Sequence, residues 1–194
     1  MAKRAAKRKK KAARRRRALI IALSVLAVAA LALTLPGLLD KGTQNAANTY
    51  GALITLADGR ELALELYPDA APESVALFTR LADSGAYDGT SFDMTMPGLL
   101  IQDMYTGAET VRGEFAANGF ENPLTHERGA VSMGRTGNYD SGAGSFFILT
   151  HACAEFDGMY AVFGRVTHGM EYADAIAESG ETCVIKSVRV YKDS

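Results

Sequence analysis

Short apolar runs separated by turn-forming residues constrain this chain more than any other feature of its sequence. The run at 60–67 alternates strictly, with three leucines on one face and polar or small residues on the other, which is the period of a half-buried antiparallel strand. Asp58-Gly59 precedes this run and predicts a tight hairpin. Further apolar or alternating runs lie at 53–56, 99–102, 130–133, 146–150, 160–166 and 184–191.

Two segments have the period of an amphipathic helix instead. The first begins at Pro72, a residue suited to a first helical turn, and ends at Gly85; the second runs from Met170 to Ser179. Many short strands with only two helices favour a mainly β domain whose sheet closes on itself, because closure removes exposed strand edges. The periodicity alone is consistent with either a barrel or a sandwich.

The N-terminal region differs in composition from the rest of the chain. Residues 1–17 contain eleven Lys and Arg and no acidic residue, and 18–35 are apolar except for Ser24 and Thr34. A helix of about 20 apolar residues spans a bilayer, and flanking basic residues stay cytoplasmic. We therefore expect a basic cytoplasmic tail at 1–17, one N-terminal transmembrane helix that contacts the lipid bilayer at 18–39, a linker at 40–50 and an extracytoplasmic domain at 51–194.

A cleaved signal peptide is the alternative interpretation of 18–39. The apolar region of a signal peptide usually has about 7–15 residues and is followed by a cleavage site of small residues. The candidate sites at 27–29 and 30–32 both lie inside the apolar run, which favours the uncleaved anchor. The first interpretation makes the chain a single-pass cell-membrane protein, and the second makes it a secreted one.

The charge of the chain after residue 39 excludes some classes of partner. The whole chain carries −1, yet all 22 acidic residues and only ten of the 21 basic ones follow residue 39, which gives that part a net charge of −12. Such a surface repels nucleic acid and anionic lipid. We expect no nucleic-acid partner, and since nothing in the sequence indicates an obligate interface, we expect a monomer.

Cysteine and histidine do not form the patterns typical of metal sites. The chain has two cysteines, Cys153 and Cys183, with no Cys-x-x-Cys pair, and its three histidines form no His-Glu-x-x-His motif. An oxidising exterior permits a disulfide between the two cysteines, and two unpaired thiols are the alternative. His126, which precedes Glu127-Arg128-Gly129, is interpreted as a residue that stabilises a turn.

The segment 91–102, SFDMTMPGLLIQ, resembles the signature of the cyclophilin family. Phe92, the Pro97-Gly98 turn and Gln102 fit that signature. The resemblance covers about 53–192 and implies a closed eight-stranded antiparallel barrel with two capping helices. Four further blocks are similar to bacterial cyclophilins: 61–92, 113–136, 144–149 and 156–170.

The resemblance implies peptidyl-prolyl cis-trans isomerase activity and binding of proline-containing segments of exported proteins. Rotation about a peptide bond faces a barrier of about 18–20 kcal/mol, and X–Pro bonds interconvert slowly although their cis content is appreciable. A catalyst must seat the proline ring in an apolar pocket and stabilise the twisted amide by hydrogen bonds. This chemistry requires no nucleophile, metal or cofactor.

The resemblance also assigns a substrate groove to the sequence. Gln102 corresponds to the family's hydrogen-bonding glutamine and is the implied catalytic residue. The implied proline pocket consists of Leu99, Leu100, Phe147, Phe156 and Tyr160, and the strand edge that pairs with the peptide backbone consists of Gly134, Arg135 and Thr136.

Several groove positions depart from the family pattern. Met94 stands at the position of the catalytic arginine, and a thioether has no donors to replace a guanidinium. Asp93 and Ser145 replace a histidine and a second glutamine, and the loop 103–112 is shortened. Arg135 has a side chain long enough to be a candidate substitute donor. These departures predict an isomerase with a reduced rate, and the alternative is a non-catalytic proline-peptide binding module that acts as a holdase or scaffold.

Three methionines lie in or near the signature segment. Met94, Met96 and Met104, together with Leu100, are either apolar residues of the barrel or part of an adaptable recognition surface, for which flexible thioethers are well suited. The sequence alone does not choose between these interpretations.

Overall fold

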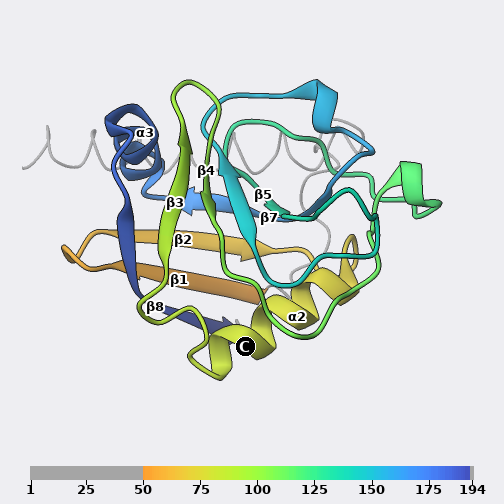
Figure 1. Cartoon of the computed structure of the whole chain (residues 1–194), viewed down its shortest axis with the longest axis horizontal. Coiled ribbons are helices and arrows are strands. Elements are labelled where there is room, and N and C mark those ends of the chain that lie inside the picture. Colours follow the sequence, from red (N-terminus) through yellow and green to blue (C-terminus); the bar gives the residue numbers. More distant parts are fainter. Residues whose placement is uncertain (1–49, 193–194) are drawn as a thin grey trace, which may run out of the picture. The chain divides into compact units, whose positions relative to one another are not determined.

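The computed structural model describes residues 50–192, which form eight strands and two α-helices (Figure 1). The predicted tail and anchor and nearly all of the predicted linker lie outside the described residues. Within 50–192 neither helix has the length and apolar character needed to cross a bilayer. The elements are β1 (Tyr50–Leu56), β2 (Glu61–Leu66), α2 (Pro72–Asp83), β3 (Ser91–Met96), β4 (Leu100–Asp103), β5 (Ala130–Met133), β6 (Phe146–Leu149), β7 (Ala161–His168), α3 (Met170–Ser179) and β8 (Cys183–Lys192), with single 3-10 turns η1 (Ala116–Asn118) and η2 (Ala154–Phe156).

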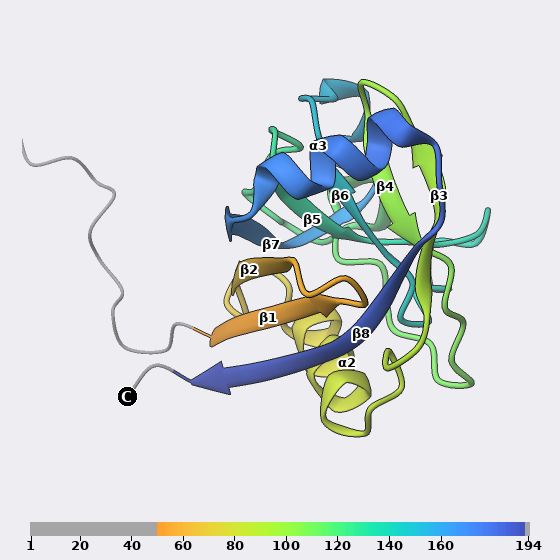
Figure 2. The same ribbon diagram turned by 90° about the vertical axis from the view of Figure 1, so that its left-hand side faces the viewer.

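The eight strands form one closed antiparallel barrel in the order β1-β2-β7-β5-β6-β4-β3-β8. β1 pairs with β2 on one side and with β8 on the other, so the first and last strands close the sheet. This closure decides between the two predicted architectures in favour of the barrel. Figures 1 and 2 show α2 and α3 on opposite sides of the strands. Because residues 50–192 supply every strand of the closed barrel, they form a complete folding unit.

The first hairpin follows the sequence pattern closely. The Asp58 side chain accepts a hydrogen bond of 3.0 Å from the backbone N–H of Arg60, and Gly59 has a φ of 88°, which favours glycine. In β2 the three leucines are buried and Glu61 is exposed. The predicted alternation of this strand is therefore confirmed.

A second tight turn, between β3 and β4, sets the register of these two strands. The backbone N–H of Leu99 donates to the carbonyl of Met96 at 3.0 Å across Pro97-Gly98, and Gly98 has a φ of 69°. Proline followed by a glycine with positive φ is the composition of a type II turn. The resulting register places Met94 directly opposite Gln102.

Helix α2 joins the interior of the barrel to the loop before η1. Phe78 packs against Tyr87, Phe146 and Phe163 with ring centroids 5.3–5.4 Å apart. The helix has no side-chain cap of its own. Instead the buried Glu114 accepts hydrogen bonds from the backbone N–H groups of Glu73 and Ser74 at 2.7 and 2.8 Å. A carboxylate at this end also complements the helix dipole.

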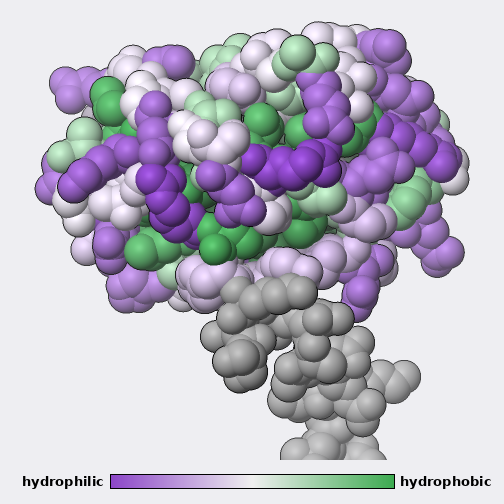
Figure 3. Space-filling view, turned by 90° about the horizontal axis from the view of Figure 1, so that it is seen from below, coloured by the Kyte–Doolittle hydropathy of each residue, from purple (hydrophilic) through white to green (hydrophobic). Residues whose placement is uncertain are grey.

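The surface of the domain is mixed in character. Figure 3 views the domain from below the orientation of Figure 1, and hydrophilic residues cover much of that face with hydrophobic residues visible between them. Exposed ion pairs on the described surface include Arg189 with Asp88 and Arg128 with Asp174, each at 2.7 Å. Pairs of this kind contribute little to stability individually.

Candidate functional site

Strand β6 is apolar on both faces, and this is what places a second apolar cluster outside the barrel. Phe146 and Ile148 belong to the barrel core, whereas Phe147 and Leu149 belong to the other cluster. Since side chains alternate between the faces of a strand, a buried four-residue run must pack on both sides. We call this second group the outer cluster; its buried members are Leu100, Ala130, Phe147, Leu149 and Val162.

A cavity of about 320 Å³ opens beside the outer cluster. Its aromatic end consists of Phe147, Phe156 and Tyr160, whose ring centroids are 5.0–5.8 Å apart. These rings come from β6, from η2 and from the residue before β7. We call this space the aromatic cavity; it is lined by Met94, Met96, Leu100, Gln102, Met104, Gly134, Arg135, Phe147, Phe156 and Tyr160.

The buried His126 lies against all three rings of the aromatic cavity. Its ring centroid is 6.2 Å from that of Phe147, 5.8 Å from that of Phe156 and 6.4 Å from that of Tyr160. Its Nδ1 is 2.9 Å from Asp157 Oδ1, and its Nε2 is 2.9 Å from Ser132 Oγ. An ionised carboxylate only accepts hydrogen bonds, so we assign the proton to Nδ1 and let Nε2 accept from Ser132.

Burial governs the protonation of this histidine. Desolvation lowers the pKa of His126 below its usual value, and the hydrogen bond and charge of Asp157 oppose that shift. The side chain is 1% exposed, and a neutral ring is what burial favours. The sequence predicts only a turn-stabilising role for His126, and its contacts also place it against the aromatic rings.

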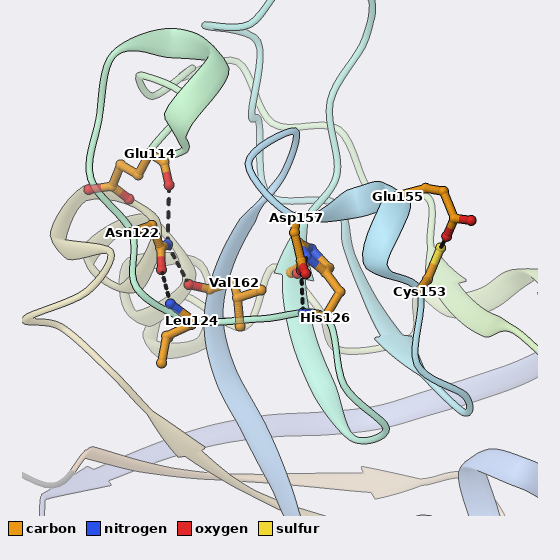
Figure 4. A network of polar contacts seen from close by, with 9 residues as sticks. Glu114, Asn122, Leu124, His126, Cys153, Glu155, Asp157 and Val162 are labelled. Carbon is orange, nitrogen blue, oxygen red and sulfur yellow. Dashed lines mark hydrogen bonds and ion pairs between the residues drawn. The ribbon is translucent and has the colours of Figure 1, made fainter.

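Hydrogen bonds attach the loop that carries His126 to β7 and η2 (Figure 4). Asn122 donates to the carbonyl of Val162 at 2.9 Å and accepts from the backbone N–H of Leu124 at 3.0 Å. Asp157 Oδ1 also accepts from the backbone N–H of His126 at 2.7 Å. These bonds hold both sides of the aromatic end in place.

The two cysteines are both free in the structure. Figure 4 shows Cys153 beside Glu155, next to η2, with its Sγ 3.4 Å from Glu155 Oε2. Burial is the main reason that the pKa of each thiol is raised, and the Glu155 carboxylate raises that of Cys153 further. The thiol form is therefore favoured over the more reactive thiolate at both positions.

Gln102 is held by Ser145, the residue that replaces a second glutamine of the family pattern. Its Nε2 donates to Ser145 Oγ at 2.9 Å, and Ser145 Oγ donates in turn to the carbonyl of Asp103 at 2.5 Å. A Cβ at Gly134 would stand 2.9 Å from Gln102 Nε2 and 2.7 Å from Ser145 Oγ. Glycine at 134 therefore leaves room for this arrangement, and the second N–H and the oxygen of the Gln102 amide are free to face a ligand.

Three exposed methionines border the aromatic cavity. Met94, Met96 and Met104 are 40%, 43% and 48% exposed, whereas Leu100 is 4% exposed and belongs to the outer cluster. Met94 and Met96 thus belong to a barrel strand, and all three methionines form part of the surface. We call these three residues the methionine rim.

The side chain of Arg135 forms one wall of the cavity. Its Nε and Nη2 donate to the carbonyl of Met159 at 3.0 and 2.9 Å, and its Nη1 donates to the carbonyl of Thr136 at 2.8 Å. The guanidinium carbon lies 4.5 Å from the centroid of the Tyr160 ring. Three of its five N–H groups are thus committed to the backbone, which leaves two for a ligand.

Two residues that the resemblance assigned to the groove lie outside the lining of the aromatic cavity. Leu99 is partly buried and packs against the outer cluster, because the turn ends at Leu99 and β4 begins one residue later. Thr136 lines an adjoining cavity of about 130 Å³, which also includes Gln102 and Ser145. The other assigned residues, including Met94, Gln102 and Arg135, come together around one space.

The described residues offer no group of three or more His, Cys, Asp or Glu side chains that could hold a metal ion. The aromatic cavity instead combines an apolar end with an oriented amide and an arginine wall. Such a space can desolvate an apolar ring and donate hydrogen bonds to the backbone beside it.

Comparison with known proteins gives one consistent result. Residues 52–192 match the family model described as cyclophilin type peptidyl-prolyl cis-trans isomerase/CLD. The chain is 39% identical over 142 residues to peptidyl-prolyl cis-trans isomerase B of Bacillus subtilis (strain 168), which covers 70% of this chain and 94% of that protein. It is 38% identical over 144 residues to peptidyl-prolyl cis-trans isomerase A of Dickeya dadantii (strain 3937), which covers 68% of this chain and 72% of that protein.

The fold also matches solved structures. A cyclophilin type peptidyl-prolyl cis-trans isomerase of Cryptosporidium parvum superimposes with a TM-score of 0.66 at 22% identity, covering 75% of this chain and 99% of the other. The same protein crystallised in the presence of the dipeptide Ala-Pro gives a TM-score of 0.64 at 21% identity, covering 74% and 99%. At this level of identity the likeness supports the fold.

Proposed function

The chain belongs to the cyclophilin-type peptidyl-prolyl cis-trans isomerases, and on this premise we propose that it isomerises X–Pro bonds of exported proteins at a rate reduced by Met94. Proline-containing peptide segments are the substrates of this family. The proline ring enters the aromatic end, and the Gln102 amide hydrogen-bonds to the peptide beside it.

The single observation that carries the reduced rate is the position of Met94. Its thioether lines the aromatic cavity opposite Gln102, where the family pattern has a charged donor. A hydrogen bond to a charged group contributes about 1.5–3 kcal/mol, and loss of one transition-state donor costs about 10²–10³ in rate. The apolar end and Gln102 keep binding and part of the stabilisation.

We propose that Arg135 supplies some of the hydrogen-bond donors that are lost because position 94 is a methionine. It lines the same cavity, and two of its N–H groups are free of backbone partners. Its stacking on Tyr160 fixes the guanidinium at the cavity wall. A donor held in place loses less entropy when it binds than one on a mobile side chain.

NMR exchange spectroscopy on a short X–Pro peptide tests this proposal, with a fragment of residues 47–194. The natural fragment should accelerate cis-trans exchange measurably, and Met94→Arg should accelerate it about 10²-fold further. Val184→Arg is the matched control, since it adds the same charge at an exposed position of β8 that does not line the cavity.

Acceleration by Met94→Arg alone would replace the proposal with the alternative of a binding module. The alternative has one observation in its favour, namely the exposed thioether at the arginine position. Equal rates for the natural fragment and Met94→Arg would contradict the role given to Met94.

Export and membrane attachment are the second part of the proposal. They are supported by the basic residues at 1–17, the apolar run at 18–35 and the net charge of −12 that follows. The full-length chain should stay with bacterial membranes after alkaline extraction, and deletion of 18–35 should release it. A shortened chain in the medium would support the cleaved signal instead, and a soluble full-length chain would contradict both.

A further inference from the structure

The methionine rim concentrates exposed apolar surface at one place on the domain. Five large hydrophobic side chains are exposed among residues 50–192, and three of them are Met94, Met96 and Met104. The other two, Val184 and Tyr191, lie on β8 and do not line the aromatic cavity. A local gathering of exposed apolar side chains is typical of an interaction site.

The rim adjoins the place where residues next to a bound proline must lie. The aromatic cavity of about 320 Å³ has the volume of about ten water molecules at liquid density, so a five-membered ring fills only part of it. Phe147, Phe156 and Tyr160 form one end. The three methionines line the same cavity as these rings, so a side chain flanking a proline seated at the aromatic end can reach them.

The lining offers a basic flanking side chain no counterpart, and an acidic one only Arg135, whose two remaining N–H groups the proposed function assigns to the bound peptide. It contains no acidic residue, and its one basic residue, Arg135, already donates three hydrogen bonds to backbone carbonyls. A charged side chain that enters such a space loses water without gaining an equivalent partner. An apolar side chain instead gains contact with the thioethers.

Methionine is better suited than a rigid apolar residue to contact flanking side chains of different shapes. Its side chain is unbranched, has three rotatable bonds and a polarisable sulfur, and adapts to neighbours of different shapes. Two such side chains on β3 and a third directly after β4 form a deformable apolar surface. They fit large apolar partners without selecting one shape.

We propose that the methionine rim is a specificity determinant that selects X–Pro segments with a large apolar residue next to the proline over segments with a charged one. The proposal rests on the proposed function, because it assumes that the proline ring occupies the aromatic end. It names the substrate class as proline flanked by leucine, isoleucine, methionine or phenylalanine. Such segments are buried in folded proteins and exposed in unfolded ones.

Binding of blocked tetrapeptides to the 47–194 fragment tests this, followed by NMR chemical-shift titration. One series, Ala-Xaa-Pro-Ala, varies the residue before proline, and the other, Ala-Ala-Pro-Xaa, varies the residue after it, with Xaa as Leu, Ala, Glu or Lys. We expect the Leu peptide to bind about tenfold more tightly than the Glu and Lys peptides in at least one series. The Ala peptide should lie between them.

Variants of the methionine rim test whether these residues cause the preference for the Leu peptide. Met96→Gln with Met104→Gln should reduce the preference for the Leu peptide over the Glu and Lys peptides from about tenfold to about twofold. Val184→Gln removes a side chain of similar exposure elsewhere and should leave the preference unchanged. Because all three positions are exposed, amide spectra of these variants should show the native fold.

Two outcomes overturn the inference: equal affinities for the Leu, Glu and Lys peptides in both series, or an unchanged preference in the rim double variant. The titration does not depend on turnover. Selective binding without accelerated exchange would uphold the rim and refute the proposed isomerase activity, whereas exchange without selectivity would do the reverse.

Discussion

The barrel core and the outer cluster share strands, but the core is closed whereas the outer cluster borders an open cavity. Along β6, Phe146 and Ile148 face the core, and Phe147 and Leu149 face the outer cluster. The core side is closed by pairing of all eight strands. The outer side borders the aromatic cavity and the buried polar groups of His126 and Ser132. One strand thus serves stability with alternate residues and binding with the others.

The outer cluster differs from the barrel core in the hydrogen-bonded polar side chains that lie beside it. Buried polar atoms are costly unless they are hydrogen-bonded. In the outer cluster each has partners: His126 bonds to Asp157 and Ser132, and Gln102 bonds to Ser145. These bonds fix orientation beside an opening, which a binding site requires. Tyr87 is the corresponding case in the core, and its hydroxyl donates to the Gly144 carbonyl at 2.8 Å.

Gly134→Ala should lower peptide affinity without disturbing the barrel core. Its Cβ would approach Gln102 Nε2 and Ser145 Oγ within 3 Å, so the amide must turn away from the cavity. Peptide affinity should fall about tenfold, which is about 1.4 kcal/mol, with little loss of stability because the core is untouched. Gly137→Ala is the control, since its Cβ would have no neighbour within 4 Å. Equal affinities of the two variants in an NMR titration would contradict the role of Gly134.

A smaller effect concerns the outer cluster, where His126 should make the free energy of unfolding depend on pH. Burial lowers the pKa of His126 in the folded chain, so below about pH 6.5 the unfolded chain binds more protons. The stability that His126 contributes is present above that pH and is lost as the pH falls toward the lowered pKa, by at most about 1.4 kcal/mol per pH unit.

Urea unfolding between pH 7.5 and 5 measures this contribution. His126→Gln should flatten the decline, while His168→Gln, at an exposed position of β7, should keep it. Identical pH profiles of the natural fragment and His126→Gln would show that the buried histidine does not titrate as described.

Much of the barrel could be predicted from the sequence because its signals are local. The alternation of β2, the Asp58-Gly59 turn and the bounds of α3 at Met170–Ser179 each depend on neighbours within one element. Strand β3 has no such signal. Only Phe92 in it is buried, and Met94 and Met96 face solvent, so its position followed from the family resemblance and not from periodicity.

The fine structure of the site could not be predicted because its contacts join distant parts of the chain. Gln102 and Ser145 are 43 residues apart, and His126 and Asp157 are 31 apart. Nothing in the sequence near Ser145 indicates that it orients the glutamine. The residues that the resemblance assigned to the groove lie around the aromatic cavity or beside it, with Leu99 packed against the outer cluster.

The most direct test of the division between core and cluster compares Phe146→Ala with Phe147→Ala. Phe146 packs among Phe78, Tyr87 and Phe92, so its removal should cost about 3–5 kcal/mol of unfolding free energy and leave peptide affinity of the folded fraction unchanged. Phe147→Ala should cost less, because solvent can enter from the cavity, and should abolish proline-peptide binding. Natural affinity in Phe147→Ala, or equal loss of affinity in both variants, would contradict the account.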